Sequence, residues 1–222
     1  EALARWRRAD GAIVPPVAFI EKLEKAGMMD QLTWVMLERA ATDCRAWQEH
    51  GHHVSVSVNL SLTTLTDPTV ADRVAEVVNG AGLKASQMIL EVTESAAMTD
   101  VGRALENLAR LRMKGFGLAI DDFGTGYSSM SQLARIPFTE LKIDQSFVKD
   151  ASKRERLQVM ISSSLEMARR LGLNTVAEGV ETREDWDLLK RLGCDIAQGY
   201  FVARPMSSED LMKWAQEWKA PA

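Results

Sequence analysis

The sequence is poor in the residues that build disulfide scaffolds and zinc centres. Its 222 residues include only two cysteines, Cys44 and Cys194, and three histidines, which lie together at positions 50, 52 and 53. Two cysteines so far apart exclude a disulfide framework and a cysteine-rich zinc site, and they favour a reducing compartment. We therefore expect both thiols to be inert and buried. The histidines are expected to form a solvated turn rather than a metal site.

The chain also lacks an excess of basic residues and a long apolar run. Lys and Arg number 27 against 31 Asp and Glu, which gives a net charge of −4 and excludes a generally basic surface for binding DNA or RNA, though not a local basic patch. No apolar run reaches the ~18 residues of a membrane span and no signal peptide is recognisable, so a cytoplasmic location is expected, whether or not the parent protein is membrane-anchored. Because the chain begins at Glu1 rather than at methionine, residues 1–222 are interpreted as one domain cut from a longer multidomain protein.

Short apolar runs alternate with longer amphipathic segments along the chain. The β-branched or alternating runs predict strands at 54–60, 88–92, 116–120, 141–144, 175–178 and 195–198. Apolar residues at three- and four-residue spacing predict helices at 19–50 (interrupted near Gly27), 70–81, 101–114, 155–171, 183–192 and 207–218. This alternation is typical of parallel strands covered by helices. An open doubly wound sheet and a closed barrel both satisfy it.

Nearly every predicted strand ends in a polar or ionisable residue. These residues are Asn59, Glu91, Glu94, Asp121, Asp122, Lys142, Asp144, Glu178, Glu181 and Gln198. In a barrel of parallel strands the carboxyl ends converge on one face, where active sites form. The plainer alternative is that each residue only begins its own loop, which suits Asp and Asn.

Acidic residues dominate this predicted face. Arg5 and Lys142 are the obvious counter-charges to eight carboxylates: Glu1, Glu91, Glu94, Asp121, Asp122, Asp144, Glu178 and Glu181. Burying like charges together is costly, so the cluster must take up protons or cations. Oxygen ligands favour Mg²⁺, Mn²⁺ or Ca²⁺ over zinc. The adjacent pair Asp121-Asp122 suits two ions about 4 Å apart, the arrangement that promotes in-line phosphoryl displacement.

A glycine- and hydroxyl-rich segment, residues 123–129, follows the aspartate pair directly. Gly124 and Gly126 permit backbone angles that would let this segment fold closely over a ligand. A simple tight turn is the alternative. Its position after two acidic residues favours a lid or a support for a metal loop.

Seven short motifs occur in order along almost the whole chain. They are Glu1-Ala2-Leu3, Val58-Asn59-Leu60-Ser61, Leu90-Glu91-Val92-Thr93-Glu94-Ser95, Asp121-Asp122-Phe123-Gly124-Thr125-Gly126-Tyr127, Leu141-Lys142-Ile143-Asp144, Ala177-Glu178-Gly179-Val180-Glu181-Thr182 and Gln198-Gly199-Tyr200. With these motifs the chain closely resembles the EAL-domain phosphodiesterases, which hydrolyse the bacterial second messenger cyclic di-GMP.

The resemblance implies an α/β fold, a TIM-like (β/α)8 barrel with one antiparallel strand, whose first strand would precede Glu1. It implies two Mg²⁺ or Mn²⁺ ions per active site, with Ca²⁺ inhibitory. The implied metal ligands are Glu1, Asn59, Glu91, Asp121, Asp122 and Glu178, and the implied catalytic residues are Glu178, Lys142 and Glu1. The implied substrate-binding residues are Leu3, Arg5, Asp144, Glu181 and Gln198. Glu94 would anchor the glycine-rich loop.

The expected reaction is hydrolysis of cyclic di-GMP to linear pGpG by two-metal in-line attack of water. A catalytically silent receptor for cyclic di-GMP is the alternative, although such relatives typically lose residues that are intact here. A barrel enzyme that uses Mg²⁺ and a lysine base for enolisation is a third possibility. The resemblance also implies a homodimer and an upstream sensory, receiver or GGDEF-type domain, and no binding to DNA or RNA polymers.

Overall fold

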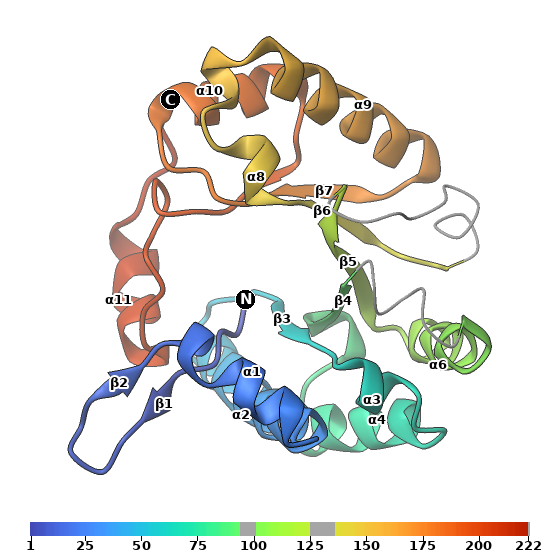
Figure 1. Cartoon of the computed structure of the whole chain (residues 1–222). Coiled ribbons are helices and arrows are strands. Elements are labelled where there is room, and N and C mark those ends of the chain that lie inside the picture. The colour runs from blue at the N-terminus through green and yellow to red at the C-terminus, as the bar shows by residue number, and fades with distance from the viewer. Residues whose placement is uncertain (94–100, 125–135, 222) are drawn as a thin grey trace.

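The computed structural model describes residues 1–93, 101–124 and 136–221, and an arc of six parallel strands runs through it (Figure 1). The strands are β3 (Val56–Asn59), β4 (Met88–Thr93), β5 (Gly117–Phe123), β6 (Glu140–Ile143), β7 (Asn174–Ala177) and β8 (Ile196–Ala197). Each strand pairs in parallel with the next one along the chain. A doubly wound sheet reverses its strand order at a switch point, and this sheet does not. The order therefore identifies the fold as a curled half-barrel of the TIM-like type.

Helices cover the outer side of the arc (Figure 1). The longer ones on this side are α2 (Met29–Glu49), α4 (Val70–Gly80), α6 (Val101–Met113), α9 (Glu155–Leu171) and α10 (Arg183–Leu192), whereas α11 (Ser208–Glu217) lies at the open side of the arc (Figure 1). Shorter helical segments are η1 (Pro16–Ala18), α1 (Ile20–Lys25), α3 (Leu62–Leu65), η2 (Ala85–Gln87), α8 (Gln145–Val148) and η3 (Ala151–Lys153). The predicted break near Gly27 is confirmed, and α9 and α10 end at Gly172 and Gly193 in the left-handed conformation.

The core lies between the strands and these helices. In β4, Leu90 and Val92 are fully buried and belong to the hydrophobic core, as are Leu141 and Ile143 in β6. Successive side chains on a strand point to opposite faces, so the residue between each apolar pair faces the inside of the arc. This alternation turns Glu91 and the neighbouring polar residues away from the helices and towards one another.

One element near the N-terminus was not predicted. Strands β1 (Trp6–Arg7) and β2 (Ile13–Val14) form an antiparallel hairpin, in which Trp6 pairs with Val14. The turn contains Asp10 and Gly11, and Gly11 has a φ of +84°. An Asp-Gly pair between short apolar segments is a hairpin signal, and it could have revealed this element. All six strands of the described sheet are parallel, so the antiparallel strand implied by the resemblance is not among them.

The two cysteines differ in their burial. Cys44 is buried and Cys194 only partly so, and burial raises the pKa of both thiols. Both are therefore poor nucleophiles.

Within the described ranges, no helix combines the length and the apolar character needed to cross a bilayer.

Candidate active site

The ammonium group of Lys142 lies among four carboxylates on the inside of the arc. Its Nζ is 2.7 Å from Oε1 of Glu178, 2.9 Å from Oε1 of Glu91, 3.3 Å from Oδ1 of Asp121 and 3.6 Å from Oε2 of Glu1. The Lys142 and Glu91 side chains are each only 2% exposed. Four acidic groups from different parts of the chain thus meet around one buried cation, as the positions of the polar residues predicted.

The backbone explains why these side chains meet. Glu91, Asp121 and Lys142 lie on the inner face of adjacent strands, and Glu178 follows β7 directly, with its N–H donating to the carbonyl of Ile143 at 3.0 Å. Parallel strands in register bring their carboxyl ends to the same edge of a sheet. The positions are far apart in sequence, but neighbouring strands bring them together.

Glu1 reaches the cluster from the N-terminal segment and is held by two amides. Asn59 Nδ2 donates to its Oε1 at 3.3 Å, and Gln198 Nε2 donates to its Oε2 at 2.7 Å. The N–H of Ala2 donates to the carbonyl of Ser57 at 2.9 Å, which ties this segment to β3. Asn59 and Gln198 belong to opposite edges of the sheet, so Glu1 bridges the two ends of the arc.

Burial and mutual repulsion perturb the acidic groups. Burial raises the pKa of Glu91 to about 7, even though Lys142 opposes the shift. Burial also raises the pKa of Glu178 and Asp122, and in Asp122 the charges of Asp121 and Asp144 add to the effect. For Glu1, burial is outweighed by Lys142 and the amide donors, and the pKa is lowered.

Lys142 stays protonated in spite of its burial. Desolvation by itself would lower the pKa of this amine, but the surrounding carboxylates outweigh desolvation and raise the pKa above its ordinary value. One positive charge cannot neutralise four carboxylates, and the pKa of Glu91 is raised by burial first and then by the charge of Glu1. The cluster therefore has the capacity to accept further positive charge, as protons or as metal ions.

The donor set is suited to a hard divalent cation. All its acidic groups are carboxylates, and Oε2 of Glu91 is buried with no hydrogen-bond partner among the described residues. Asp122 adopts a left-handed φ of +57°, a conformation that non-glycine residues rarely adopt. Over residues 1–93, 101–124 and 136–221, no three His, Cys, Asp or Glu side chains already stand in ligating geometry, since the carboxylates converge on Lys142 instead.

The predicted substrate-binding residues lie at different distances from this cluster. Gln198 contacts it directly through Glu1, and Asp144 caps helix α8, where its Oδ1 accepts the N–H of Ser146 at 2.9 Å. Glu181 pairs with the exposed Lys149, with Oε2 3.1 Å from Nζ, rather than with Lys142. Glu94 and residues 125–129 of the glycine-rich loop lie outside the described residues.

Leu3 and Arg5 continue from Glu1 along a hollow of about 650 Å³. Its other walls include residues of α2 and the start of α11, among them Arg39, Trp47 and Ser208. Leu3 is 41% exposed, and the Arg5 guanidinium contacts only the neighbouring carbonyl of Ala4 among the described hydrogen bonds. This hollow is continuous with Glu1 and is large enough to admit part of a ligand beside the cluster.

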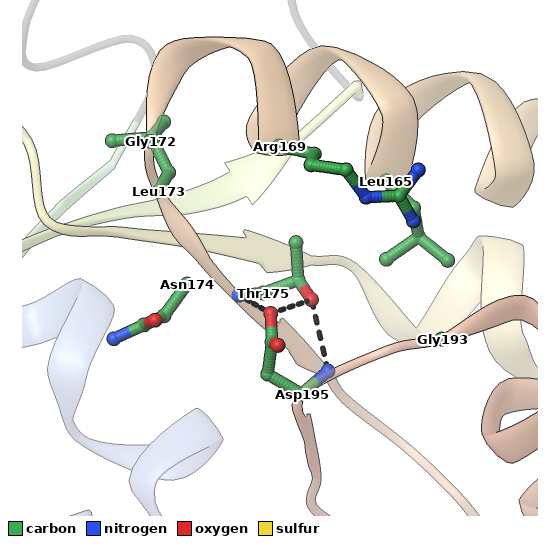
Figure 2. Close-up of a pocket in the computed structure, with 8 residues that line it drawn as sticks. All are labelled: Leu165, Arg169, Gly172, Leu173, Asn174, Thr175, Gly193 and Asp195. Carbon is green, nitrogen blue, oxygen red and sulfur yellow. Dashed lines mark hydrogen bonds between the residues drawn. The ribbon is translucent and has the colours of Figure 1, made fainter.

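A smaller hollow of about 180 Å³ lies at the opposite, amino ends of β7 and β8 (Figure 2). Thr175 and Asp195 form its floor: Asp195 Oδ2 accepts from Oγ1 and from the N–H of Thr175 at 2.7 and 2.8 Å. Its one arginine, Arg169, is already paired with Glu166 at 2.9 Å. These polar groups bond to one another, and the bonds between Thr175 and Asp195 join β7 to the residue before β8. The hollow is therefore not a second candidate site.

Sequence reasoning overlooked Ser57, which contributes to the cluster. Its hydroxyl is hydrogen-bonded to Glu91 and lowers the pKa of that carboxyl, partly opposing the effect of burial. Ser57 is two residues before Asn59 on β3 and therefore lies on the same face of the strand. This two-residue spacing from Asn59 is the sequence signal from which Ser57 could have been predicted.

The family model described as the EAL domain matches residues 1–205. The chain is 40% identical over 214 residues to an uncharacterized signaling protein of Caulobacter vibrioides, covering 96% of this chain and 26% of the relative. It is 35% identical to the cyclic di-GMP phosphodiesterase RocR of Pseudomonas aeruginosa, covering 96% of this chain and 55% of RocR. The chain thus spans about a quarter to a half of the length of these relatives.

A solved structure indicates the same family. The PaMucR phosphodiesterase in complex with c-di-GMP is 38% identical and superposes with a TM-score of 0.89, covering 94% of this chain and 85% of that one. The structural match, the family model and the clustered motif residues agree over nearly the full length. The chain is a member of the EAL domain family.

Proposed function

We propose that this chain hydrolyses cyclic di-GMP to linear pGpG in a reaction that depends on divalent metal ions. The observation that carries the proposal is the cluster of Glu1, Glu91, Asp121 and Glu178 around the buried Lys142. Relatives that share the family carry the name cyclic di-GMP phosphodiesterase, and a solved relative contains c-di-GMP. These names indicate the substrate, while the cluster indicates the chemistry.

The residues present fit two Mg²⁺ or Mn²⁺ ions. Their oxygen donors, and the unpartnered Oε2 of Glu91, match the preference of these ions. One ion would be held by Glu1, Asn59, Glu91 and Asp121, and the other by Asp121, Asp122 and Glu178. When bound, the ions supply positive charge that acidifies a water molecule and neutralises the phosphodiester, as in other two-metal in-line displacements. Ca²⁺ is larger and less strict in geometry, so we expect it to inhibit.

The chain's own groups then carry the proton and the charge. Glu178 accepts a proton from the attacking water, and burial, which raises the pKa of its carboxyl, makes it a stronger base than an exposed glutamate. Lys142 donates hydrogen bonds that hold this water and stabilise charge on the phosphate. The water oxygen bonds to phosphorus, the bond from phosphorus to the ribose 3′-oxygen breaks, and that oxygen takes up a proton. The product is the linear dinucleotide with a 5′-phosphate.

Substrate contacts are assigned to the residues around the cluster. Arg5 offers a positive charge to a phosphate from the wall of the larger hollow, and Leu3 lies beside it. Asp144, Glu181 and Gln198 are proposed to supply polar contacts to the nucleotide. Glu94 is proposed to anchor the glycine-rich loop.

The test is to incubate the purified chain with cyclic di-GMP and Mg²⁺ or Mn²⁺ and to follow pGpG by chromatography. Glu178→Ala should lower kcat by roughly 100-fold or more, because the general base and a metal ligand are lost together. Glu166→Ala, which removes an exposed carboxylate on α9, is the matched control and should leave kcat unchanged. No product from the unmodified chain with either metal would overturn the proposal.

The same experiment separates catalysis from binding alone. A receptor that does not cut cyclic di-GMP would bind the nucleotide tightly in EDTA and yield no pGpG after metal is added. We propose catalysis instead, because every acidic residue of the cluster is intact.

By family resemblance we also propose a homodimer and a regulatory domain upstream of this one.

A further inference from the structure

Three charged side chains are buried in the described part of the chain: Glu91, Lys142 and Asp185. The first two belong to the candidate active site. Asp185 is only 1% exposed and lies in the first turn of α10, away from the ammonium of Lys142. A buried carboxylate is costly to desolvate and is retained only where its partners compensate it. The position of Asp185 therefore requires an explanation of its own.

Asp185 connects two different loops. Its Oδ1 accepts the backbone N–H of Ser152 at 3.0 Å, in the segment that follows β6 and α8. Its Oδ2 accepts the hydroxyl of Thr182 at 2.8 Å, and its own N–H donates to that hydroxyl at 3.2 Å. Burial works against ionisation, but these donors lower the pKa of Asp185, so the carboxylate stays charged and keeps both contacts.

These two loops continue the chain directly from the catalytic side chains proposed above. Lys142 and Asp144 lead into α8, and Glu178 begins the loop that ends at Thr182. The loops also touch near the cluster: a Cβ at Gly179 would lie 2.4 Å from Cβ of Gln145, so only glycine permits their contact. The exposed pair between Lys149 and Glu181 adds a third, weaker contact.

We infer that Asp185 is a positioning residue, which holds the loop after β6 against the loop after β7 and thereby sets the spacing of Lys142 and Glu178. Gly179 makes contact at the inner end of the two loops, and Asp185 locks their outer end. Because the two loops are held together at both ends, the distance of 2.7 Å between Lys142 Nζ and Glu178 Oε1 is fixed. The inference rests on the proposed function, because the cost of losing this spacing is lost turnover.

Three variants distinguish a loss of loop positioning from a loss of folding stability. Asp185→Ala removes both contacts. Asp185→Asn keeps them, because its amide oxygen can accept from Ser152 while its amide nitrogen donates to the Thr182 hydroxyl. Thr175→Val is the matched control, since it removes a hydroxyl that donates to another carboxylate, that of Asp195, and accepts the backbone N–H of Asp195 at the opposite end of the sheet.

The experiment measures kcat, KM and thermal unfolding of the purified chain and its variants with Mn²⁺ and cyclic di-GMP, well below every unfolding temperature. We expect Asp185→Ala to lower kcat about 10-fold at a nearly unchanged KM. Asp185→Asn should stay within about 2-fold of the unmodified chain, and Thr175→Val should lose stability but not kcat. If Asp185→Ala does not fold, Asp185→Ser takes its place with the same expectation, because its hydroxyl is too short to span both partners.

Hydrogen exchange provides a readout that needs neither metal nor turnover. In Asp185→Ala, amides in residues 143–153 and in residues 178–185 should exchange faster together, whereas Thr175→Val should leave both segments protected. An Asp185→Ala variant whose kcat and exchange match those of Thr175→Val would overturn the inference, and so would an Asn variant as impaired as the Ala variant. An inactive unmodified chain would refute the proposed function instead, and the exchange result would then decide the inference alone.

Discussion

Nζ of Lys142 lies 2.7 Å from Oε1 of Glu178, although Lys142 lies on strand β6 and Glu178 lies in the loop after β7. Lys142 is almost completely buried, whereas the Glu178 side chain is 18% exposed. The ammonium group of this pair is therefore buried, whereas the carboxylate is partly accessible to solvent. This arrangement allows a water molecule to reach the carboxylate while the ammonium remains in place.

Replacing Lys142 by methionine should destabilise the metal-free chain. The change leaves four carboxylates without their cation, and loss of one partner from a buried ion pair costs about 3–5 kcal/mol. Added Mn²⁺ should recover much of this loss, because the metal replaces the missing charge. Thermal unfolding in EDTA and in Mn²⁺ measures both effects. Lys149→Met, at an exposed ion pair, is the control and should change little in either condition. Equal behaviour of the two variants would contradict this account of the cluster.

The stability of the metal-free chain should fall as the pH rises from about 4.5 to about 7. The pKa of Glu91 is raised to about 7 in the folded chain, so the folded state binds more protons than the unfolded state across this range. Stability declines with pH wherever the folded state holds the extra proton. The raised pKa values of Glu178 and Asp122 act in the same direction.

Denaturant unfolding in EDTA at a series of pH values tests this dependence. In Glu91→Gln the decline should become shallower, because the amide does not titrate. A dependence that is unchanged in this variant would show that Glu91 is not responsible. Glu49→Gln, at an exposed ion pair on α2, is a suitable control.

Two glycines offer a matched test of the contact between the catalytic loops. Gly179 and Gly172 have nearly the same left-handed φ, +70° and +71°, but a Cβ at Gly172 would meet no atom within 4 Å. Alanine at either position costs about 1 kcal/mol or more in backbone strain. Only Gly179→Ala should also push the two loops apart and lower kcat, by roughly 10-fold or more. Comparable kcat values for the two variants would argue against a role for this contact.

Gln198→Ala should weaken metal binding without a large loss of stability. Gln198 donates to Oε2 of Glu1 at 2.7 Å and helps to keep the pKa of that carboxyl low. Loss of a group that orients a metal ligand typically lowers affinity by about 10- to 100-fold. Calorimetric titration with Mn²⁺ measures the change, and Gln216→Ala, on the exposed face of α11, is the control. Unchanged Mn²⁺ affinity would mean that Gln198 does not position Glu1 for a metal.

The alternation of strands and helices was predictable because it depends on local periodicity. Strand β4 and helices α9 and α10 lie within a residue or two of their predicted bounds, since their apolar spacing and glycine ends are local signals. The acidic residues at strand ends were visible for the same reason. The convergence of Glu91, Asp121 and Glu178 followed from the rule that parallel strands align their carboxyl ends.

The sequence by itself determined the element types, the acidic cluster and the family, because motifs and periodicity are properties of neighbouring residues. Only the tertiary structure chose the half-barrel over the doubly wound sheet, since strand order depends on pairing between distant segments. It also revealed that Lys142 lies among four carboxylates, that Glu181 pairs with Lys149, and that Asp185 joins two loops. These contacts depend on how the loops pack across the top of the sheet, and no local pattern in the chain encodes that packing.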